Sequence, residues 1–204
     1  MVFAATKHDR RAVRLGVGLA LALLPMPALA QSAPPNIYAR VAQRLSANPG
    51  IAATINKAPP EMAALANMVG DWHFEMTITA LPDAPTIMGS SEVTSEFDGV
   101  WIHSLDTAAS GTQTSGYIGY SALTKRWTNI AVDSMGNANT LTADGWQGNR
   151  LVFEGDVVEL GEKAHLRETL TRVSDNEYRI ETEELLGGGW KQLSTGHYTR
   201  ISKG

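Results

Sequence analysis

The sequence predicts an all-β protein: an antiparallel up-and-down β-barrel of about ten strands, preceded by short N-terminal helices. From Asp71 onward, apolar and polar residues alternate in successive runs of about five to ten residues, which is the pattern of half-buried strands. Glycine, asparagine and aspartate stand between these runs at regular spacing, as expected for hairpin turns. A meander of this length exposes two edges unless it closes on itself, so a barrel is favoured.

Two short helical segments are expected ahead of the strands. Ile37, Val41 and Leu45 recur every four residues, which places them on one face of a helix that Asn48-Pro49-Gly50 should end. A second segment begins near Pro60, a good first-turn residue, and continues to about residue 70. We expect both segments to pack against the domain or to cover one end of the barrel.

The strands follow one another with turn signals between them. In the first strand Trp72, Phe74 and Met76 share one face, and polar residues occupy the other. Asp98-Gly99 is a dipeptide of the strongest two-residue hairpin type. The other strands are expected at residues 91–97, 100–106, 115–122, 126–133, 139–143, 151–155, 163–173, 177–185 and 190–201.

A barrel of ten strands is wide enough to enclose a small molecule and too narrow for an aqueous channel. A transmembrane barrel is the alternative, but the strands lack a continuous apolar outer band. One domain is expected, with residues 31–59 as a leader that contains the first helix and residues 60–204 as the barrel domain.

Residues 1–30 have the features of a secretory signal peptide. Basic residues come first, a short apolar run follows at residues 15–24, and Ala28-Leu29-Ala30 forms a small-x-small cleavage site. The run falls well short of the ~20 apolar residues that span a membrane. We therefore expect cleavage after Ala30 and a periplasmic or secreted protein with no membrane insertion once the signal is removed. The basic residues are Lys7, Arg10, Arg11 and Arg14.

The pair Arg10-Arg11 also resembles a twin-arginine signal, which would export the protein after it has folded. Arg14 stands where a leucine is usual in such signals, so ordinary secretion is preferred.

Charge and cysteine content exclude several functions. The whole chain carries a formal net charge of −4, and removal of residues 1–30, which hold four basic residues and one acidic residue, leaves −7. An acidic domain of this kind is a poor candidate for binding nucleic acid or anionic membrane surfaces. The chain has no cysteine, so disulfides, thiolate metal sites and cysteine nucleophiles are excluded.

A set of short motifs follows in a fixed order along residues 65–201. They are Leu65-x-x-x-x-Gly70-x-Trp72, Asp98-Gly99-x-Trp101, Gly119-Tyr120, Lys125-Arg126-Trp127, Asp133-Ser134, Gly189-Trp190 and Tyr198-x-Arg200. In this combination the sequence resembles the bacterial domain-of-unknown-function 1579 family, a lipocalin-like (calycin-type) group whose members are often exported. The resemblance implies a fold and no established reaction, so it carries over no catalytic residues.

The opening motif looks like the entry to a lipocalin-like barrel. In that group a short helix closes the base, a glycine turns the chain, and a tryptophan on the first strand packs across the bottom beneath a basic residue of the last strand. The resemblance therefore implies a structural base formed by Gly70, Trp72 and Arg200. A guanidinium stacked in this way contributes about 0.5–2 kcal/mol.

A related barrel group, the nitrobindins, binds haem through a histidine on the last strand, where this chain has His197. The nitrobindin opening motif is Gly-x-Trp-x-Gly-x-Gly, and Phe74 and Met76 replace its second and third glycines here. Strict alternation also places His197 on the opposite face from Tyr198 and Arg200. A surface or rim histidine is therefore preferred to a haem ligand, and no cofactor is expected.

Aromatic residues on different strands suggest an apolar cavity with a few polar groups. The leading hypothesis is an exported barrel of unknown physiological role that binds a small, partly hydrophobic molecule. Filling of the core is the alternative for each of these residues taken singly. The candidate ligand-binding residues are Trp101, His103, Tyr120, Trp127, Asp133 and Tyr178.

The second hypothesis is a small-substrate enzyme on the same barrel. Asp133 would act with His103 or His165 in acid–base chemistry, which requires a direct or water-bridged hydrogen bond between them. The structural alternative is that Asp133 and Ser134 end a strand and cap the amides of a turn. The histidines do not have the spacing of a metal site, so no metal is expected and no catalytic residue is assigned.

Overall fold

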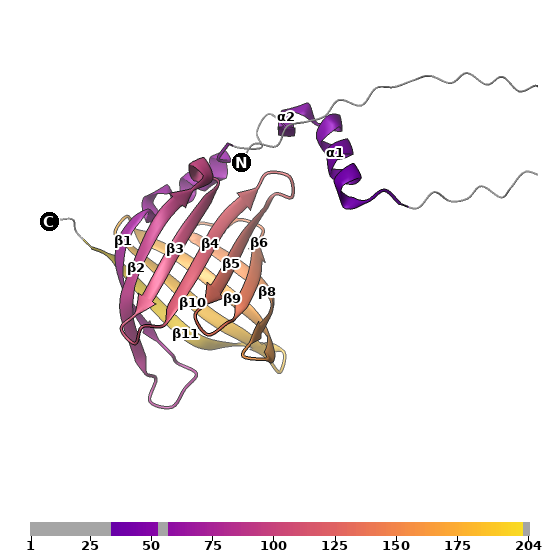
Figure 1. Cartoon of the computed structure of the whole chain (residues 1–204). Helices are drawn as coiled ribbons and strands as arrows, with labels where there is room; N and C mark the ends of the chain where they lie inside the picture. The colour runs from indigo at the N-terminus through magenta and orange to yellow at the C-terminus, as the bar shows by residue number, and fades with distance from the viewer. Residues whose placement is uncertain (1–33, 53–56, 202–204) are drawn as a thin grey trace, which may run out of the picture.

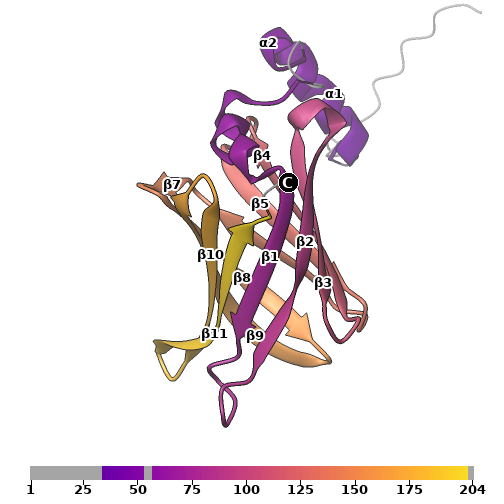
Figure 2. The same cartoon turned by 90° about the vertical axis from the view of Figure 1, so that its left-hand side faces the viewer.

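The computed structural model describes residues 34–52 and 57–201, which form a closed β-barrel with helical segments beside one end (Figure 1, Figure 2). The predicted signal peptide, residues 1–30, and the expected cleavage after Ala30 lie outside the described residues. Ten antiparallel strands close the ring in the order β1, β2, β3, β4, β5, β6, β8, β9, β10 and β11, with β11 paired back to β1. The predicted all-β barrel of about ten strands is confirmed.

The short strand β7 pairs with β8 beyond the closed ring. In chain order the strands are β1 (Gly70–Thr77), β2 (Thr86–Glu96), β3 (Trp101–Ala108), β4 (Gln113–Ser121), β5 (Arg126–Asp133), β6 (Ala138–Ala143), β7 (Trp146–Gln147), β8 (Arg150–Glu159), β9 (Glu162–Ser174), β10 (Glu177–Leu186) and β11 (Gly189–Arg200).

Alternation along each strand determines the inner and outer faces of the barrel wall. On β1, Trp72 and Phe74 are buried inside, and the intervening His73 is exposed outside. Residues paired directly across neighbouring strands share a face, so Gly89, which pairs with Phe74, and Ala108, which pairs with Gly89, also face inward. The buried apolar residues are Met62, Leu65, Trp72, Phe74, Val93, Ile102, Trp127, Leu141, Ala143, Leu151, Phe153, Val157, Leu170, Tyr178 and Tyr198.

The 3₁₀ segment η1 (Pro60–Met68) covers one end of the barrel and buries Met62 and Leu65 (Figure 2). The indole N–H of Trp72 donates to the Met68 carbonyl at 2.8 Å, which ties η1 to the first strand. The Arg200 guanidinium lies 4.2 Å above the Trp72 ring centroid. Gly70 has φ 137°, and a Cβ there would lie 2.5 Å from Arg200 Nη1, so only glycine fits beneath the stack.

The N-terminal helices are α1 (Ile37–Ala47) and α2 (Pro49–Ala52). The side chain of Asn36 caps α1 by accepting a hydrogen bond from the Ala39 amide at 3.0 Å. No residue of α1 is buried, and Ile37 and Val41 of its apolar face are exposed, so the expected packing of this helix against the domain is not observed. An apolar stripe specifies a helix without specifying the surface that covers it. Among the described residues no helix is long and apolar enough to cross a membrane.

The hairpin between β2 and β3 differs from the expected two-residue turn. Glu96 pairs with Trp101, and the four residues between them include a single 3₁₀ turn, η2 (Phe97–Gly99). Phe97, Asp98 and Gly99 all have positive φ, so the Asp-Gly signal supplies only part of a longer left-handed turn.

Backbone pairing is sparsest between β6 and β8, where the ladder consists of Thr142 opposite Glu154. Toward the other end of β6, side chains hold the two strands together. The Asn137 Oδ1 atom accepts from the Leu160 amide at 2.9 Å, and Asn139 Nδ2 donates to Glu159 at 2.5 Å. The barrel is therefore closed at this seam partly by asparagine side chains.

Candidate ligand cavity

The barrel encloses a cavity of about 440 Å³. It extends from Met68 of η1 to the hairpin turns at the opposite end, where Ser110, Thr112 and Met135 line it. The Met135 side chain is exposed and marks the mouth. Most of the wall is apolar, with contributions from Phe74, Met76, Ile87, Val93, Ile102, Ile118, Leu170 and Ile180.

Two carboxyl groups project into this mostly apolar cavity. The Tyr198 hydroxyl donates to Asp106 Oδ2 at 3.1 Å, and Asn129 Nδ2 donates to Glu168 Oε1 at 2.7 Å. Asp106 on β3 and Glu168 on β9 lie on opposite walls, five strand steps apart in either direction around the ring. Polar groups from four strands therefore converge on the lumen.

Burial in the cavity raises the pKa values of the two carboxyl groups and of the neighbouring tyrosines. Burial, reinforced by the nearby charge of Asp106, raises the pKa of Glu168 to about 7, although the Asn129 hydrogen bond opposes the shift. The surface that Glu168 retains faces the cavity, because the residue lines it. Burial also raises the pKa of Asp106 and, with the charge of Asp106, the pKa values of Tyr178 and Tyr198. Both phenols therefore stay neutral near pH 7.

One carboxylate oxygen of Asp106 has no hydrogen-bond partner. Asp106 Oδ1 is fully buried and accepts no hydrogen bond. The Ser91 hydroxyl is near enough to lower the pKa of Asp106, but no bond of acceptable geometry joins the two side chains. The Ser91 hydroxyl beside Asp106 Oδ1 is also buried and without a partner, so this oxygen lies within the wall and not at the cavity surface.

Tyr178 is the one predicted ligand residue that lines the cavity directly. Its ring stacks on Tyr198 with centroids 4.4 Å apart and meets the Trp72 ring edge-on at 4.7 Å. Trp127 and Tyr120 also face inward, 5.2 Å apart. Trp127 is buried among core residues and does not line the cavity. For this residue the structure matches the alternative role, filling of the core.

Asp133 ends β5 and caps the turn that follows. Its Oδ1 accepts from the amides of Met135 and Asn137 at 2.9 and 3.0 Å, and Oδ2 accepts from Asn137 Nδ2 at 2.8 Å. The Asn137 side chain holds the pKa of Asp133 below its usual value. Ser134 Oγ accepts from the Gln113 amide at 3.0 Å. These contacts correspond to the strand-end interpretation of the Asp-Ser pair.

Trp101 and His103 lie on the outer face of β3, because Ile102, Ser104 and Asp106 occupy the inner positions. The Trp101 ring covers Gly119, and a Cβ on that glycine would lie 2.6 Å from the ring. The His103 ring stacks on an outer-face tyrosine of β4 and hydrogen-bonds Ser115 at 2.8 Å. Neither residue lines the cavity, and His103 cannot reach Asp133 through the wall.

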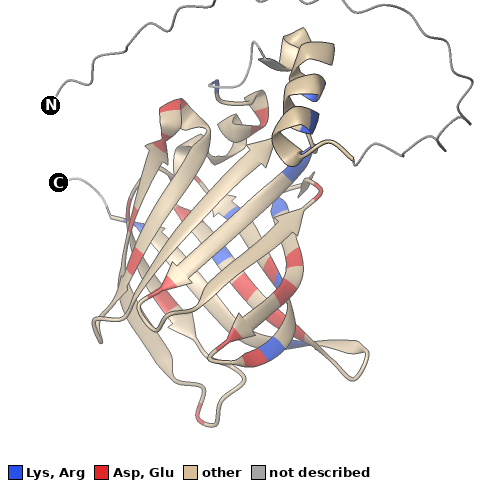
Figure 3. Cartoon of the chain, turned by 45° about the vertical axis from the view of Figure 1, so that its right-hand side comes forward, with Lys and Arg blue, Asp and Glu red and all other residues tan. Residues whose placement is uncertain are grey.

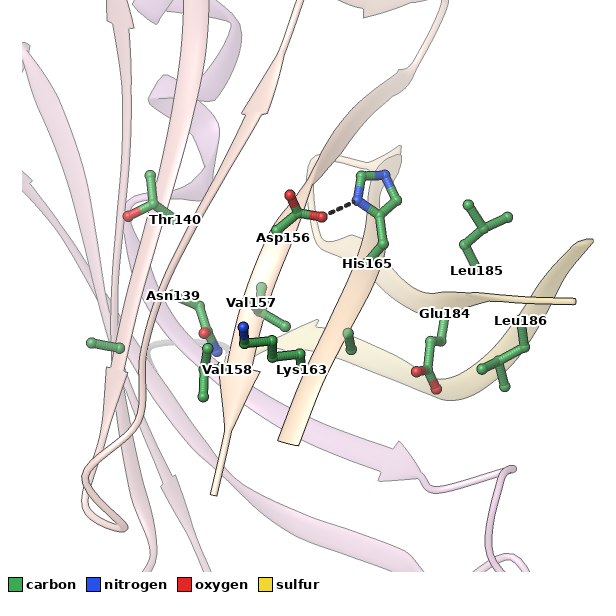
Figure 4. A pocket seen from close by; sticks show the side chains of 12 residues that line it. Asn139, Thr140, Asp156, Val157, Val158, Lys163, His165, Glu184, Leu185 and Leu186 are labelled. Carbon is green, nitrogen blue, oxygen red and sulfur yellow. Dashed lines mark hydrogen bonds and ion pairs between the residues drawn. The ribbon is translucent and has the colours of Figure 1, made fainter. Parts of the chain in front are cut away.

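The other two candidate histidines also face outward. His197 Nε2 hydrogen-bonds Glu177 Oε1 at 2.8 Å and lies on the opposite face from Tyr198, so it does not point into the cavity. His165 Nδ1 hydrogen-bonds Asp156 Oδ1 at 2.7 Å beside an outer hollow of about 640 Å³ (Figure 4). The geometry required for acid–base chemistry between Asp133 and a histidine is therefore not met.

The outer hollow is larger but less suited to binding than the interior cavity. It is open, and the Asp156 side chain is 92% exposed, so its charge is well solvated. The interior groups are enclosed, which strengthens their electrostatic interactions. Within the described residues no group of three or more histidine, aspartate or glutamate side chains is placed to hold a metal ion.

Comparison with known families and structures agrees with this fold. The family model described as "Protein of unknown function (DUF1579)" matches residues 57–200. The chain belongs to this family. No curated protein matches the chain.

The barrel of this DUF1579 member is similar to the crystal structure of Rv2717c from M. tuberculosis, with a TM-score of 0.54 and 11% identity over 71% of this chain and 99% of that one. An identity this low shows the fold alone. A redesigned beta barrel also matches, at a TM-score of 0.32 and 15% identity over 70% of this chain and 96% of the design.

Sequence reasoning missed the residues that form the hydrogen-bonded acid pairs in the cavity of this DUF1579 member: Asp106, Asn129, Glu168 and Tyr198. A signal for two of them was present. Glu168 shares a strand face with Leu166 and Leu170, and Asp106 shares one with Ile102. A lone carboxyl on an otherwise apolar face marks a buried acid. Some charges on the outer wall are instead paired, as where Arg167 contacts Glu154 and Glu183. Figure 3 shows basic and acidic positions along the strands of the barrel.

Proposed function

We propose that this protein binds a small, partly hydrophobic molecule inside its barrel. The observation that carries the proposal is the interior cavity of about 440 Å³, which lies within the size range of small-molecule sites. Its apolar wall supplies affinity by removing ligand surface from water. Its polar groups, among them Asp106, Glu168, Asn129 and the two tyrosines, supply orientation.

Native mass spectrometry of the gently purified protein tests this function, followed by solvent extraction of any bound compound. We expect a species that carries one additional small molecule per chain, which extraction removes and identifies. A protein that carries no such molecule, and that binds no apolar probe in a saturable one-to-one manner, would contradict the proposal.

The proposal includes export, on the basis of the signal features of residues 1–30. Fractionation of the native host and mass measurement of the recovered protein test this part. The expected result is a mature chain beginning at Gln31 in the periplasmic or secreted fraction. A full-length chain that stays in the cytoplasm would overturn it and would leave the binding proposal standing.

A further inference from the structure

We propose that the molecule bound in the barrel carries a basic amine, whose ammonium group lies between Asp106 and Glu168 while its apolar body packs against the rest of the wall. This inference rests on the proposed function and specifies the chemical class of the ligand.

The charge content of the cavity wall is the first observation. Asp106 and Glu168 face the lumen from opposite sides, and none of the described residues that line the cavity is Lys, Arg or His. A cation that enters the lumen meets negative charge with no competing positive group, whereas a carboxylate meets only repulsion. The electrostatics of the wall therefore select for a positive or donor-rich ligand.

Unused acceptor capacity is the second observation. Tyr198 donates to one oxygen of Asp106 and Asn129 donates to one oxygen of Glu168. The second oxygen of Glu168, Oε2, accepts no hydrogen bond and is not fully enclosed by the wall, so it can accept from a ligand in the cavity. An ammonium group has three N–H donors and no acceptor, so it matches a site that consists of acceptors. Charge-assisted bonds of this kind are about twice as strong as neutral ones.

The repulsion between the two acids is the third observation. The charge of Asp106 contributes to the raised pKa of Glu168, and the other titratable groups facing the pair are the neutral phenols of Tyr178 and Tyr198. The positive charge of Arg200 lowers the pKa of Tyr178 at the base of the barrel and does not contribute to the pKa shift of Glu168. An ammonium between the acids favours ionised Glu168, so binding should weaken as the pH falls through about 7.

A metal ion fits these observations less well than an organic cation. A divalent ion such as calcium takes about six to eight oxygen ligands, and the described residues contain no cluster of three His, Asp or Glu side chains that could hold one. The other polar residues of the wall are neutral and add no further negative charge for such an ion, whereas the apolar surface accommodates a hydrocarbon body.

Three probes with the same alkyl chain test the proposal: octylamine, 1-octanol and octanoate. Each is titrated by calorimetry and by displacement of Nile red, a neutral apolar dye, at pH 8 and pH 5.5. The variants are Asp106→Asn and Glu168→Gln, which keep a side-chain oxygen for Tyr198 and Asn129. Glu75→Gln, on the outer face of β1, is the matched control.

At pH 8 we expect octylamine to bind about tenfold or more tightly than 1-octanol, with octanoate weakest. The amine advantage should fall about tenfold at pH 5.5 and in either cavity variant, and should persist in Glu75→Gln. Retained Nile red binding by the variants shows that their cavities are intact.

Equal binding of amine and alcohol, preference for octanoate, or no binding of octylamine by a protein that binds Nile red would overturn the amine inference alone. Failure of Nile red itself to bind would count against the proposed function as well.

Discussion

At the scale of single residues, Glu168 is an enclosed carboxyl whose pKa is strongly raised. Its carboxyl faces an apolar cavity, receives a hydrogen bond from Asn129, and is repelled by Asp106. Its pKa rises from 4.5 to about 7, so the folded state holds the proton more tightly than the unfolded state between these two values. Stability contributed by this group is therefore complete below about pH 4.5 and is lost as the pH rises through 7.

Glu168→Gln should remove this loss. In urea denaturation, the variant should gain about 2 kcal/mol of unfolding free energy relative to the parent on going from pH 5 to pH 8, because the amide cannot ionise. Glu75→Gln on the outer wall serves as the control. A difference between variant and parent that is the same at both pH values would show that Glu168 titrates normally.

Arg200→Ala should destabilise the barrel base. The guanidinium stacks on Trp72 and donates to the carbonyls of Asn67 and Val69, so its removal leaves these acceptors without this donor. We expect a loss of about 3 kcal/mol in thermal or urea unfolding. Arg179→Ala is the matched control: its side chain is 52% exposed and pairs with Glu177, so its loss should cost less than about 0.5 kcal/mol. Equal effects of the two substitutions would contradict this account.

The sequence identifies which residues of a strand share a face, but not which face is inside. Trp101 and His103 share a face as expected, yet Ile102 and Asp106 occupy the interior. The aromatic ring suggested the inner face, but Trp101 fills the space beside a glycine on the outside. That arrangement depends on the partner strand, whose register the alternation of a single strand cannot specify.

At the scale of strands, close backbone approach limits which residues the wall tolerates. On the inner face of β2, a Cβ at Gly89 would lie 2.3 Å from the Thr107 carbonyl oxygen and 2.5 Å from the Phe74 ring. Gly89→Ala should therefore cost more than about 2 kcal/mol in unfolding free energy. Gly189→Ala on β11, with open space around its Cβ, should cost less than about 0.5 kcal/mol. A tolerated Gly89→Ala would mean that β1, β2 and β3 pack less closely than described.

The seam between β6 and β8 should depend on Asn137. Its side chain accepts from the Leu160 amide and donates to Asp133, and the residue is buried. Asn137→Ala leaves these partners unsatisfied, which should cost about 2 kcal/mol and accelerate hydrogen exchange of β6 amides. Asn176→Ala is the control, because that residue bonds through its backbone: its amide donates to Ser174 Oγ and its carbonyl accepts from the Arg200 amide. Unchanged exchange in β6 would show that the ladder alone closes the barrel.

Strand positions were predictable because alternation and turn residues act locally. The 123–125 turn and the strands on either side were found from the sequence in this way. The conformation of η1 and the exposure of α1 were not, because both depend on what lies opposite the segment. The side-chain closure of the β6–β8 seam joins residues about twenty positions apart, which no local pattern reveals.

At the scale of the whole molecule, the barrel combines a packed base with a cavity toward the opposite end. Trp72, Trp127, Leu65 and Leu151 fill the interior with exposures of at most 2%. The cavity occupies the remaining interior space, and Asp106 and Glu168 line it among mostly apolar side chains. The Arg200 contacts hold the base independently of the two acids, because they involve Trp72 and the Val69 carbonyl and neither carboxyl group.

The central claim is that the interior cavity is the binding site, and blocking it is the most direct test. Ala131 lines the cavity, and its neighbour Val132 on the same strand faces outward with 43% exposure. The measurement compares Nile red titrations of the parent, Ala131→Phe and Val132→Phe. We predict saturable one-to-one binding by the parent and by Val132→Phe, and binding at least about tenfold weaker by a folded Ala131→Phe, since the new ring occupies the cavity. Equal binding by both variants, or no saturable binding by the parent, would contradict the account.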